Sequence, residues 1–534
     1  MAKGYLRVDR DQPFLLPPDM RDWLPADHVV WLVIEAVRRL DTSAFHARRR
    51  TGGAGAAGYD PDMMVTLLVW AYANGITSSR RIERLCQQDV AFRVICAGRA
   101  PDHVTVARFR QQFAETAAGL FAQVLLLCAR LGMGQVGVVA LDGTKIAADA
   151  SKDANRTEDG LRRLAAEMAA AHADADGRED ALFGEGGRGD DDPGDPRTRE
   201  GRVAAALASL EAEREAREAA ERAAAAESLE RARAGASKGG RAPAGAEVAL
   251  AEERVAREAA AYQARVAARQ AAGRHHGGTP PVPAEQYCRV RQARAALERA
   301  RARDAARAQA PGGGSKKKKR RERSQRNVTD PDSRLMPLRG GGFLQGYNPQ
   351  NVSSEDGLVI ATRLVSTPGD VQWYEPMIAE AQDAAAMMAA AGGPGTGEIG
   401  LALADAGYLS EANLTCPGPD RLIATGKRRD LERAARDPAR DPAGDPAGER
   451  PAPPIAAMAA RLATPDGIAA YRRRSHIGET FHGDLKHNMG IRRLTVRGLP
   501  RASGEWTFAV AVRNLRKAIT SGHLTAQALA ALPA

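Results

Sequence analysis

The chain has 534 residues, a formal net charge of +11 and an aromatic content of only 4%. Its length predicts two or three domains, and its positive charge favours a polyanionic partner such as nucleic acid, although a membrane surface or an acidic protein would also fit. The five cysteines are scattered without a C-x-x-C pair, which argues against a disulfide framework or a structural zinc site. No run approaches about 18 apolar residues, so we expect a cytoplasmic protein without a membrane partner.

Residues 1–130 are predicted to form a helical domain. Apolar residues at helical spacing indicate helices near residues 29–37, 61–74 and 78–88. Residues 102–113 predict a turn followed by a helix with Arg108 and Arg110 on its exposed side. This pattern is typical of a helix-turn-helix that binds DNA, and equally typical of a basic amphipathic helix packed in a bundle.

The periodicity then changes to that of strands, in two stretches of sequence. The first stretch is residues 131–152 and the second is residues 327–518, followed by a tail at 519–534. Together they predict an α/β layer arrangement. The strands are expected at residues 136–141, 145–148, 342–348, 358–366, 399–404 and 422–425, with a helix at residues 373–391.

Residues 153–326 interrupt this pattern and predict a long, charged helical insertion that is partly disordered. They are rich in Ala, Arg and Glu, with helix-favouring stretches at 203–234, 246–271 and 284–310 and no sustained heptad. The insertion ends in a basic run, which usually indicates a solvated, flexible arm, and contact with DNA phosphates is a second interpretation. That run consists of Lys316, Lys317, Lys318, Lys319, Arg320 and Arg321.

Three acidic residues stand where a metal site could form. Asp142 follows one buried strand, Asp405 follows another, and Glu479 lies on a predicted helix. Carboxylate oxygens are the ligands that Mg²⁺ requires, and a pair of such ions can activate a nucleophile and stabilise a leaving oxygen in phosphodiester cleavage. Any single aspartate after a strand is more often a turn former or a helix cap.

The predicted helix around Glu479 has two distinct faces. At about 100° per residue, Ile477, Phe481 and Leu485 make an apolar stripe, whereas Glu479 and Lys486 share a different face. A surface helix with charge pairs explains this spacing equally well. The nearby histidines, at positions 476, 482 and 487, do not follow the spacing of a zinc site.

The spacing of Tyr471, Arg474, Glu479 and Lys486 resembles the Tyr-Arg-Glu-Lys motif of DDE transposases from bacterial insertion sequences. The chain departs from that motif by one residue, because four residues instead of the usual three separate Arg474 from Glu479. Further segments resemble the insertion-sequence 1182 branch of this group. They lie at residues 12–18, 141–146, 151–157, 327–334, 404–408 and 513–517.

The resemblance implies an RNase H-like catalytic core in which Asp142, Asp405 and Glu479 bind Mg²⁺ or Mn²⁺, as two ions. It also implies that Tyr471, Arg474 and Lys486 contact DNA near the cut and that the N-terminal helices bind the transposon ends, with a homodimer on the DNA. Family members nick these ends with water and then use the 3′-hydroxyl to attack target DNA. Two alternatives stay open: a catalytically inactive DNA-binding protein of a decayed element, and a metal-dependent nuclease without strand transfer.

Overall fold

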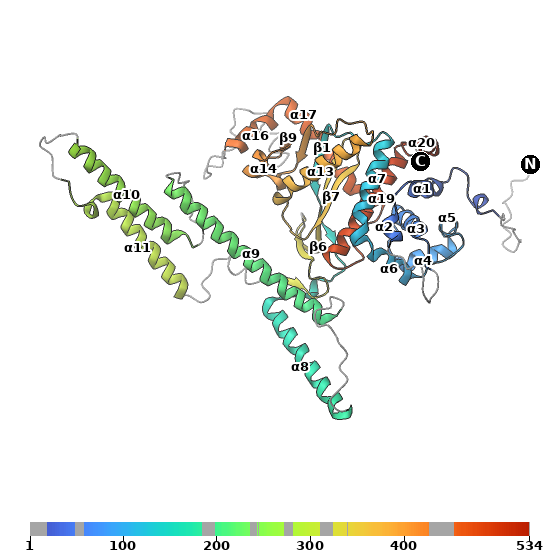
Figure 1. Cartoon of the computed structure of the whole chain (residues 1–534), viewed down its shortest axis with the longest axis horizontal. Helices are drawn as coiled ribbons and strands as arrows, with labels where there is room; N and C mark the ends of the chain where they lie inside the picture. Colours follow the sequence, from blue (N-terminus) through green and yellow to red (C-terminus); the bar gives the residue numbers. More distant parts are fainter. Residues whose placement is uncertain are drawn as a thin grey trace, which may run out of the picture. The chain divides into compact units, whose positions relative to one another are not determined.

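The computed structural model describes residues 19–47, 58–183, 198–234, 243, 245–271, 281–309, 324–338, 340–426 and 453–532. The chain divides into two compact units. One consists of Met1–Ala154 with Thr329–Ala534, and the other of Asn155–Val328. The first unit holds the large sheet, and the second interrupts it in the sequence (Figure 1).

The first unit is built on one mixed sheet. β1 lies at its centre, antiparallel to β6 and parallel to β8, and β8 is in turn parallel to β9. Since β1 and β8 run in the same direction with Leu141 opposite Ala404, both strands end at the same edge of the sheet. The strands are β1 (Val138–Gly143), β2 (Ile146–Ala147), β5 (Arg334–Pro337), β6 (Phe343–Ser354), β7 (Val359–Val365), β8 (Leu401–Ala404) and β9 (Asp420–Ile423).

Strand β6 is longer than the sequence predicts. We predicted a strand at residues 342–348, but β6 continues to Ser354, and the polar side chains of this added part are buried. Its first half pairs with β2 and β5, and its second half lies between β1 and β7. Polar partners on neighbouring strands make the burial possible: the Thr362 hydroxyl on β7 donates to Asn351 Oδ1 at 2.6 Å.

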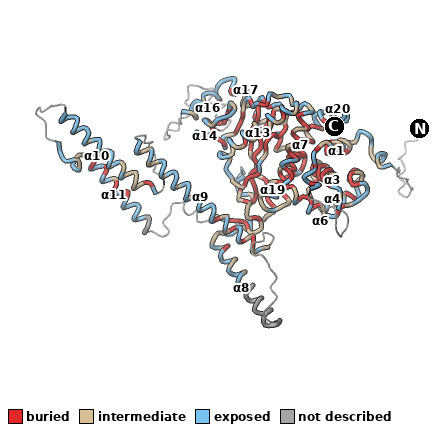
Figure 2. Tube along the Cα trace, in the orientation of Figure 1, coloured by how far each residue is buried: buried red, intermediate tan, exposed pale blue. Residues whose placement is uncertain are grey.

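Helices cover both faces of this sheet. Because successive side chains of a strand point to opposite faces, β1 contributes Val139 and Leu141 to one hydrophobic core and Val138 and Ala140 to another. Figure 2 shows the buried residues concentrated in this unit. The larger core includes residues of α7 (Phe113–Arg130), α13 (Tyr374–Ala390) and α19 (Leu499–Thr520). The smaller core includes residues of α16 (Pro453–Ala463), and residues of α17 (Pro465–Arg474) pack against it.

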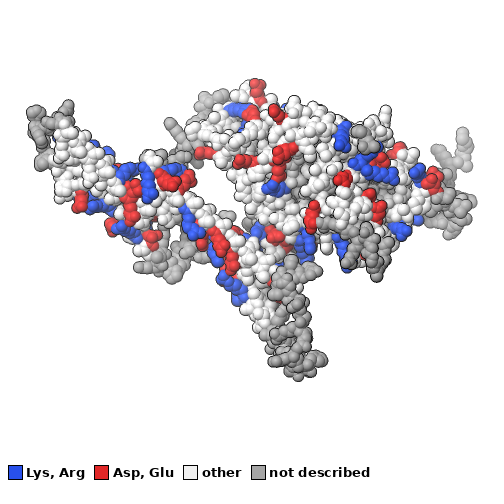
Figure 3. Space-filling view, in the orientation of Figure 1, with Lys and Arg blue, Asp and Glu red and all other residues white. Residues whose placement is uncertain are grey.

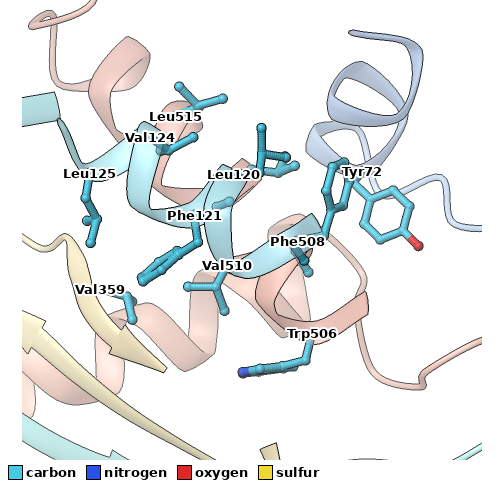
Figure 4. Packing of buried hydrophobic residues seen from close by; sticks show 14 of the residues in the cluster. Tyr72, Leu120, Phe121, Val124, Leu125, Val359, Trp506, Phe508, Val510 and Leu515 are labelled. Atoms are coloured by element: carbon cyan, nitrogen blue, oxygen red, sulfur yellow. The ribbon is translucent and has the colours of Figure 1, made fainter. Parts of the chain in front are cut away.

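Helices α7 and α19 form the central helical pair of the larger core (Figure 4). The rings of Phe113 and Phe508 stack with their centroids 4.1 Å apart. A Cβ atom at Gly504 would lie 2.4 Å from the Phe113 backbone, so only glycine permits this close approach. Among the described helices, α7 alone is long and apolar enough to cross a bilayer, with half of that window buried. Its packing against α19 accounts for its apolar face.

The N-terminal helices belong to the same unit and share its larger core. Local signals fix where two of them begin: the Asp60 side chain caps a helix whose first residue is Pro61, and Asp102 caps α6. Near the other end of the chain, α20 (Ala526–Ala531) packs on α1. The N-terminal helices are η1 (Met20–Trp23), α1 (Val29–Arg38), α2 (Ser43–His46), α3 (Pro61–Ala73), α4 (Ser79–Gln88), α5 (Val90–Ile95) and α6 (His103–Gln111).

The second unit is a set of long helices that start and end at a small ribbon. Strands β3 (Asn155–Thr157) and β4 (Gln325–Asn327) pair antiparallel, so the two ends of the insertion lie side by side. We predicted helices close to three of those observed but neither the ribbon nor the first helix. The four are α8 (Glu158–Phe183), α9 (Arg199–Arg233), α10 (Glu247–Ala271) and α11 (Cys288–Gln309).

Charges of both signs alternate along the longest helix of the insertion. Helix α9 has seven Arg and eight Glu residues, and Figure 3 shows the two signs interspersed on its surface. Its buried residues are few: Val203, Ala206 and Leu210 pack with Leu161 of α8. The helix is therefore solvated over most of its length, and its charge is close to balanced.

Candidate active site

The two aspartates lie at the ends of neighbouring parallel strands. Asp142 is the penultimate residue of β1, and Asp405 directly follows β8, where its Oδ1 accepts a hydrogen bond from the Gly407 amide at 2.8 Å. Ala140 and Leu403, two residues before each aspartate, both belong to the smaller core. Since side chains two residues apart share a face of a strand, both carboxylates project to the face covered by α17.

The guanidinium of Arg474 joins these aspartates to Glu479. Arg474, the last residue of α17, places one terminal nitrogen 3.3 Å from Asp142 Oδ1 and 3.7 Å from Asp405 Oδ2. Its other terminal nitrogen lies 3.3 Å from Glu479 Oε1. Three acidic groups that are far apart in the sequence therefore surround one cation.

A π-helical turn explains how Arg474 and Glu479 meet although they are five residues apart. In a regular α-helix, five residues rotate by about 500°, which would turn the two side chains about 140° away from each other. Residues Ser475–Glu479 instead form a π-helix, which takes about one more residue per turn. The extra residue in this motif is absorbed there, and both side chains point to the same place.

The segment around Glu479 is not the regular α-helix that we predicted. We treated the Glu479 region as one regular α-helix, whereas the π-turn is followed by α18 (Thr480–Gly483) and a second π-helix, Asp484–Asn488. The apolar stripe was nevertheless correct, because Ile477, Phe481 and Leu485 are all buried. Ile477 packs in the smaller core and the other two pack in the larger one.

The acidic groups fit a divalent cation by their chemistry. Carboxylate oxygens are the hard ligands that Mg²⁺ and Mn²⁺ prefer, and a positively charged group already lies among these three. Their oxygens are more widely spaced than in a closed metal site. Among the described residues, only His46, Asp60 and Asp62 offer three ligand atoms within 4.8 Å of one another.

The charge of Arg474 is secured by its surroundings. Burial would lower the pKa of the guanidinium, but Asp142, Tyr471, Asp405 and Glu479 together raise it above its ordinary value. The side chain is only 11% exposed, compared with 61% for that of Glu479. The arginine is thus a fixed positive charge inside the site, and the site is open to solvent on the side of Glu479.

Tyr471 lies three residues before Arg474, beneath the tip of β8. Its hydroxyl donates to the Ala404 carbonyl at 3.3 Å, next to Asp405. Burial raises the pKa of Tyr471, and the carboxylates of Asp405 and Asp142 raise it further, so the hydroxyl stays protonated.

Lys486 reaches the loop after β1 from the second π-helix. Its ammonium group donates to the Thr144 hydroxyl and, at 3.0 Å, to the Lys145 carbonyl. Burial lowers the pKa of Lys486 and the charge of Lys145 lowers it further, while Asp142 opposes both. The structure therefore brings Tyr471, Arg474 and Lys486 to the same strand ends as the acidic groups.

A polar network that we did not predict supports these strand ends. The Asp370 carboxylate accepts hydrogen bonds from the Asn348 amide at 2.7 Å and from the Gln350 amide at 2.8 Å. The Tyr408 hydroxyl donates to Gln350 Oε1. Burial raises the pKa of Tyr408 well above its ordinary value, with Asp370 and the two site aspartates adding to the effect.

Two glycines make room for this network. A Cβ atom at Gly143 would lie 2.7 Å from Gln350 Nε2, and one at Gly407 would lie 2.9 Å from Asp405 Oδ1 and 3.2 Å from Asp370 Oδ2. Asp370 is consequently a fourth carboxylate beside the three predicted ones. The sequence carries no signal for Asp370 itself, which is one polar residue in a loop.

His482 is a second group that we did not place in the site. Its ring nitrogen Nε2 lies 3.6 Å from Asp142 Oδ2, and burial together with Lys486 and Arg474 lowers its pKa to about 3. The imidazole is therefore neutral. The other two histidines that we considered, His476 and His487, are exposed.

The structure corrects our expectation for Arg110. Arg108 is exposed on α6, as predicted, but Arg110 is buried and only 7% exposed. One of its terminal nitrogens donates to Thr495 Oγ1 at 3.1 Å and lies 3.9 Å from Glu505 Oε1. Arg110 therefore joins α6 to the Thr495 segment and, through Glu505, to α19, and it presents no charge to a partner.

The basic run from Lys316 to Arg321 lies outside the described residues.

Two family models match parts of the chain. Residues 18–112 match a Transposase domain (DUF772), and residues 453–519 match a Transposase DDE domain. The second match contains Tyr471, Arg474, Glu479 and Lys486. Searches of curated proteins and of solved structures gave no match.

Proposed function

We propose that the chain cleaves DNA at the ends of an insertion sequence and joins the freed 3′-hydroxyl to target DNA. The two family matches support a DDE transposase. One observation carries the proposal: Asp142, Asp405 and Glu479 converge on a single cation at one edge of the sheet. An isolated strand-end aspartate would cap a turn, but three converging carboxylates beside basic groups suit a phosphodiester.

The order of strands supports an RNase H-like core. β7, β6, β1, β8 and β9 follow one another across the sheet, with β6 antiparallel to its neighbours and the other pairings near the site parallel. Asp142 and Asp405 then occupy the carboxyl ends of the two adjacent parallel strands, where functional groups of α/β sheets gather.

In this proposal, the three carboxylates hold Mg²⁺ or Mn²⁺, as two ions. The metal supplies stabilisation of charge at the attacking and leaving oxygens. The chain's own residues position the DNA. Lys486 and Tyr471 place a cation and a hydroxyl donor at the strand ends, where both can hold phosphate oxygens of the cut strand.

Binding to the transposon ends is assigned to the N-terminal helices. Arg108 is exposed on α6, and the adjacent helix α4 exposes Arg80, Arg81 and Arg84. Four exposed cations on two packed helices suit contact with the phosphate backbone. We further propose a homodimer on DNA, in the cytoplasm, because two ends must be cut and joined together.

The two alternatives differ from this proposal in what they need. A catalytically inactive DNA-binding protein would rely on the insertion, where α9 is close to charge balance but α11 carries seven Arg against two acidic residues, so the absence of any cleavage would identify it. A nuclease without strand transfer would use the same carboxylates, and only its products would distinguish it.

Purified protein should be incubated with duplex DNA carrying the element's ends, a target plasmid and Mg²⁺. We expect nicked ends and joined products, and both should be lost in Asp405→Asn and Glu479→Gln. Asp383→Asn, an exposed acid on α13, serves as the matched control and should react normally. Cuts without joined products would favour the nuclease, and DNA binding without any cuts would favour the inactive protein.

A further inference from the structure

We propose that Arg474 is an internal counter-ion that holds the three carboxylates together before a divalent cation binds, and that it competes with the cation for their oxygens. This inference rests on the proposed function. It concerns the same site but assigns to Arg474 a role toward the metal in addition to contact with DNA.

The contacts of the guanidinium are the first argument. Its two terminal nitrogens reach Asp142, Asp405 and Glu479 at 3.3, 3.7 and 3.3 Å. The side chains of Asp142 and Asp405 are only 10% and 24% exposed, so water screens their mutual repulsion poorly. A cation among them is needed to keep these like charges close together, and the arginine supplies it.

The spacing of the oxygens is the second argument. The three carboxylates do not offer ligand atoms within 4.8 Å of one another, although they share one guanidinium. A guanidinium has donors only and no lone pair for a metal. The same oxygens can therefore close around a cation only if the arginine withdraws from them.

The surroundings of Arg474 allow that withdrawal. Its Nε atom is buried without a hydrogen-bond partner among the described residues, so the contacts with the carboxylates leave one donor unsatisfied. Glu479 is 61% exposed and opens the site on its side. A DNA phosphate arriving there would offer the planar guanidinium two oxygens for a bidentate contact. Release of the arginine by the metal and its capture by DNA would then favour each other.

The competing explanation is that Arg474 only contacts DNA or only stabilises the fold. If Arg474 turned only toward DNA and lay away from the carboxylates in solution, its removal would leave the affinity for a divalent cation unchanged. If it only stabilised the fold, its removal would disorder the carboxylates and weaken that affinity. Competition predicts the opposite, because a variant without the guanidinium no longer has to break three contacts before the cation binds.

The test is a titration of the full-length chain with Mn²⁺, without DNA, in which electron paramagnetic resonance measures the free ion. We expect Arg474→Gln to bind Mn²⁺ about tenfold more tightly than the wild type, within the usual range of coupling between two ligands. Arg474→Lys, whose single ammonium cannot span three carboxylates, should lie between them. The matched control Arg472→Gln changes an exposed arginine on the same helix and should bind like the wild type.

Thermal unfolding in EDTA provides a second measurement. Arg474→Gln should melt below Arg472→Gln, and saturating Mn²⁺ should reduce that difference. Equal or weaker Mn²⁺ binding by Arg474→Gln would overturn the inference, and if that variant does not fold, the same criterion applies to Arg474→Lys. If the inference fails in this way, the proposed function still stands, provided that the wild type binds Mn²⁺ tightly and Asp142→Asn abolishes that binding. No Mn²⁺ binding by the wild type would overturn both.

Discussion

Two arginines on one short helix show how a single position decides between a structural and a binding role. On α6, Val106 and Phe109 face the core, and Arg110 lies four residues after Val106 and three before Phe113. Arg110 therefore falls within the apolar stripe, where Thr495 and Glu505 of the chain's far end supply its partners. Arg108 lies outside that stripe and stays in solvent.

Replacing each arginine by methionine should separate these roles. Arg110→Met leaves Glu505 buried without its counter-charge and should cost about 3 kcal/mol, whereas Arg108→Met should change the stability by less than about 0.5 kcal/mol. Urea midpoints followed by circular dichroism measure both values. For DNA binding we expect the reverse order, with only Arg108→Met weakening the affinity of the folded protein. Equal stability losses would show that the burial of Arg110 is unimportant.

At the scale of elements, the π-helix at Ser475–Glu479 sets the geometry of the site. It adds one residue to the helix. Because its turn is wider, the side chains that follow still lie on the same face of the helix. Gly478, within this turn, lies against β1, where even a Cβ atom would make only an ordinary van der Waals contact, 3.4 Å from that of Asp142. The one-residue departure from the family motif is thus a local feature with a local solution.

A deletion tests this account of the π-turn. Removing His476, which is exposed within the turn, should convert it to a regular α-helical turn and restore the usual spacing of three residues between Arg474 and Glu479. We expect the variant to keep DNA cleavage within about tenfold of the wild type. Removing Ala469 from the regular part of α17 should abolish cleavage, because the rest of the helix would rotate by about 100°. Cleavage lost equally in both deletions would contradict the account.

The second π-helix is held in place by an ion pair that should respond to pH. Burial raises the pKa of Asp484, but the Asn488 hydrogen bond and the charges of Arg516 and Arg513 outweigh it and hold the pKa below its ordinary value. Arg513 Nε donates to Asp484 at 3.2 Å, and the arginine side chain is only 3% exposed.

We expect Asp484→Asn to cost about 3 kcal/mol at neutral pH, because it leaves a buried arginine unpaired. Since the pKa is lowered on folding, the stabilisation is fully present above the unfolded value and is lost as pH falls through the folded value. The difference between wild type and variant should therefore be constant from pH 7 to about pH 4 and shrink below it. Urea midpoints across that range measure it. A difference that grew as the pH fell would have the wrong sign.

The sequence was sufficient for some elements of the site and insufficient for others. β1 and β8 could be predicted because buried apolar runs end at Asp142 and Asp405. Asp370 could not, since it is one polar residue in a loop, and its partners Asn348 and Gln350 lie on a strand whose burial depends on neighbours from distant segments. The helical rotation near Glu479 could not be predicted either, because a π-turn has no distinct periodicity in the sequence.

At the scale of the whole molecule, the insertion and the candidate site belong to different compact units of the chain. The paired strands β3 and β4 bring the two ends of the insertion together, so its length can change without altering the distance between the segments that flank it. The mixed charge of α9 keeps it solvated. In the proposed function, the chemistry depends instead on the sheet edge that gathers Asp142, Asp405 and Glu479.

These carboxylates are proposed to bind the metal that cleavage requires, and a change of metal preference tests that role most directly. Asp405→Cys replaces a hard oxygen ligand by a softer sulfur, which suits Mg²⁺ poorly and tolerates Mn²⁺ better. Cleavage of end-bearing DNA should be measured with each ion for wild type, Asp405→Cys and Asp405→Ala. The account predicts that Asp405→Cys is inactive with Mg²⁺ and recovers with Mn²⁺, while Asp405→Ala is inactive with both. Cleavage by Asp405→Ala at the wild-type rate with Mg²⁺ would contradict it.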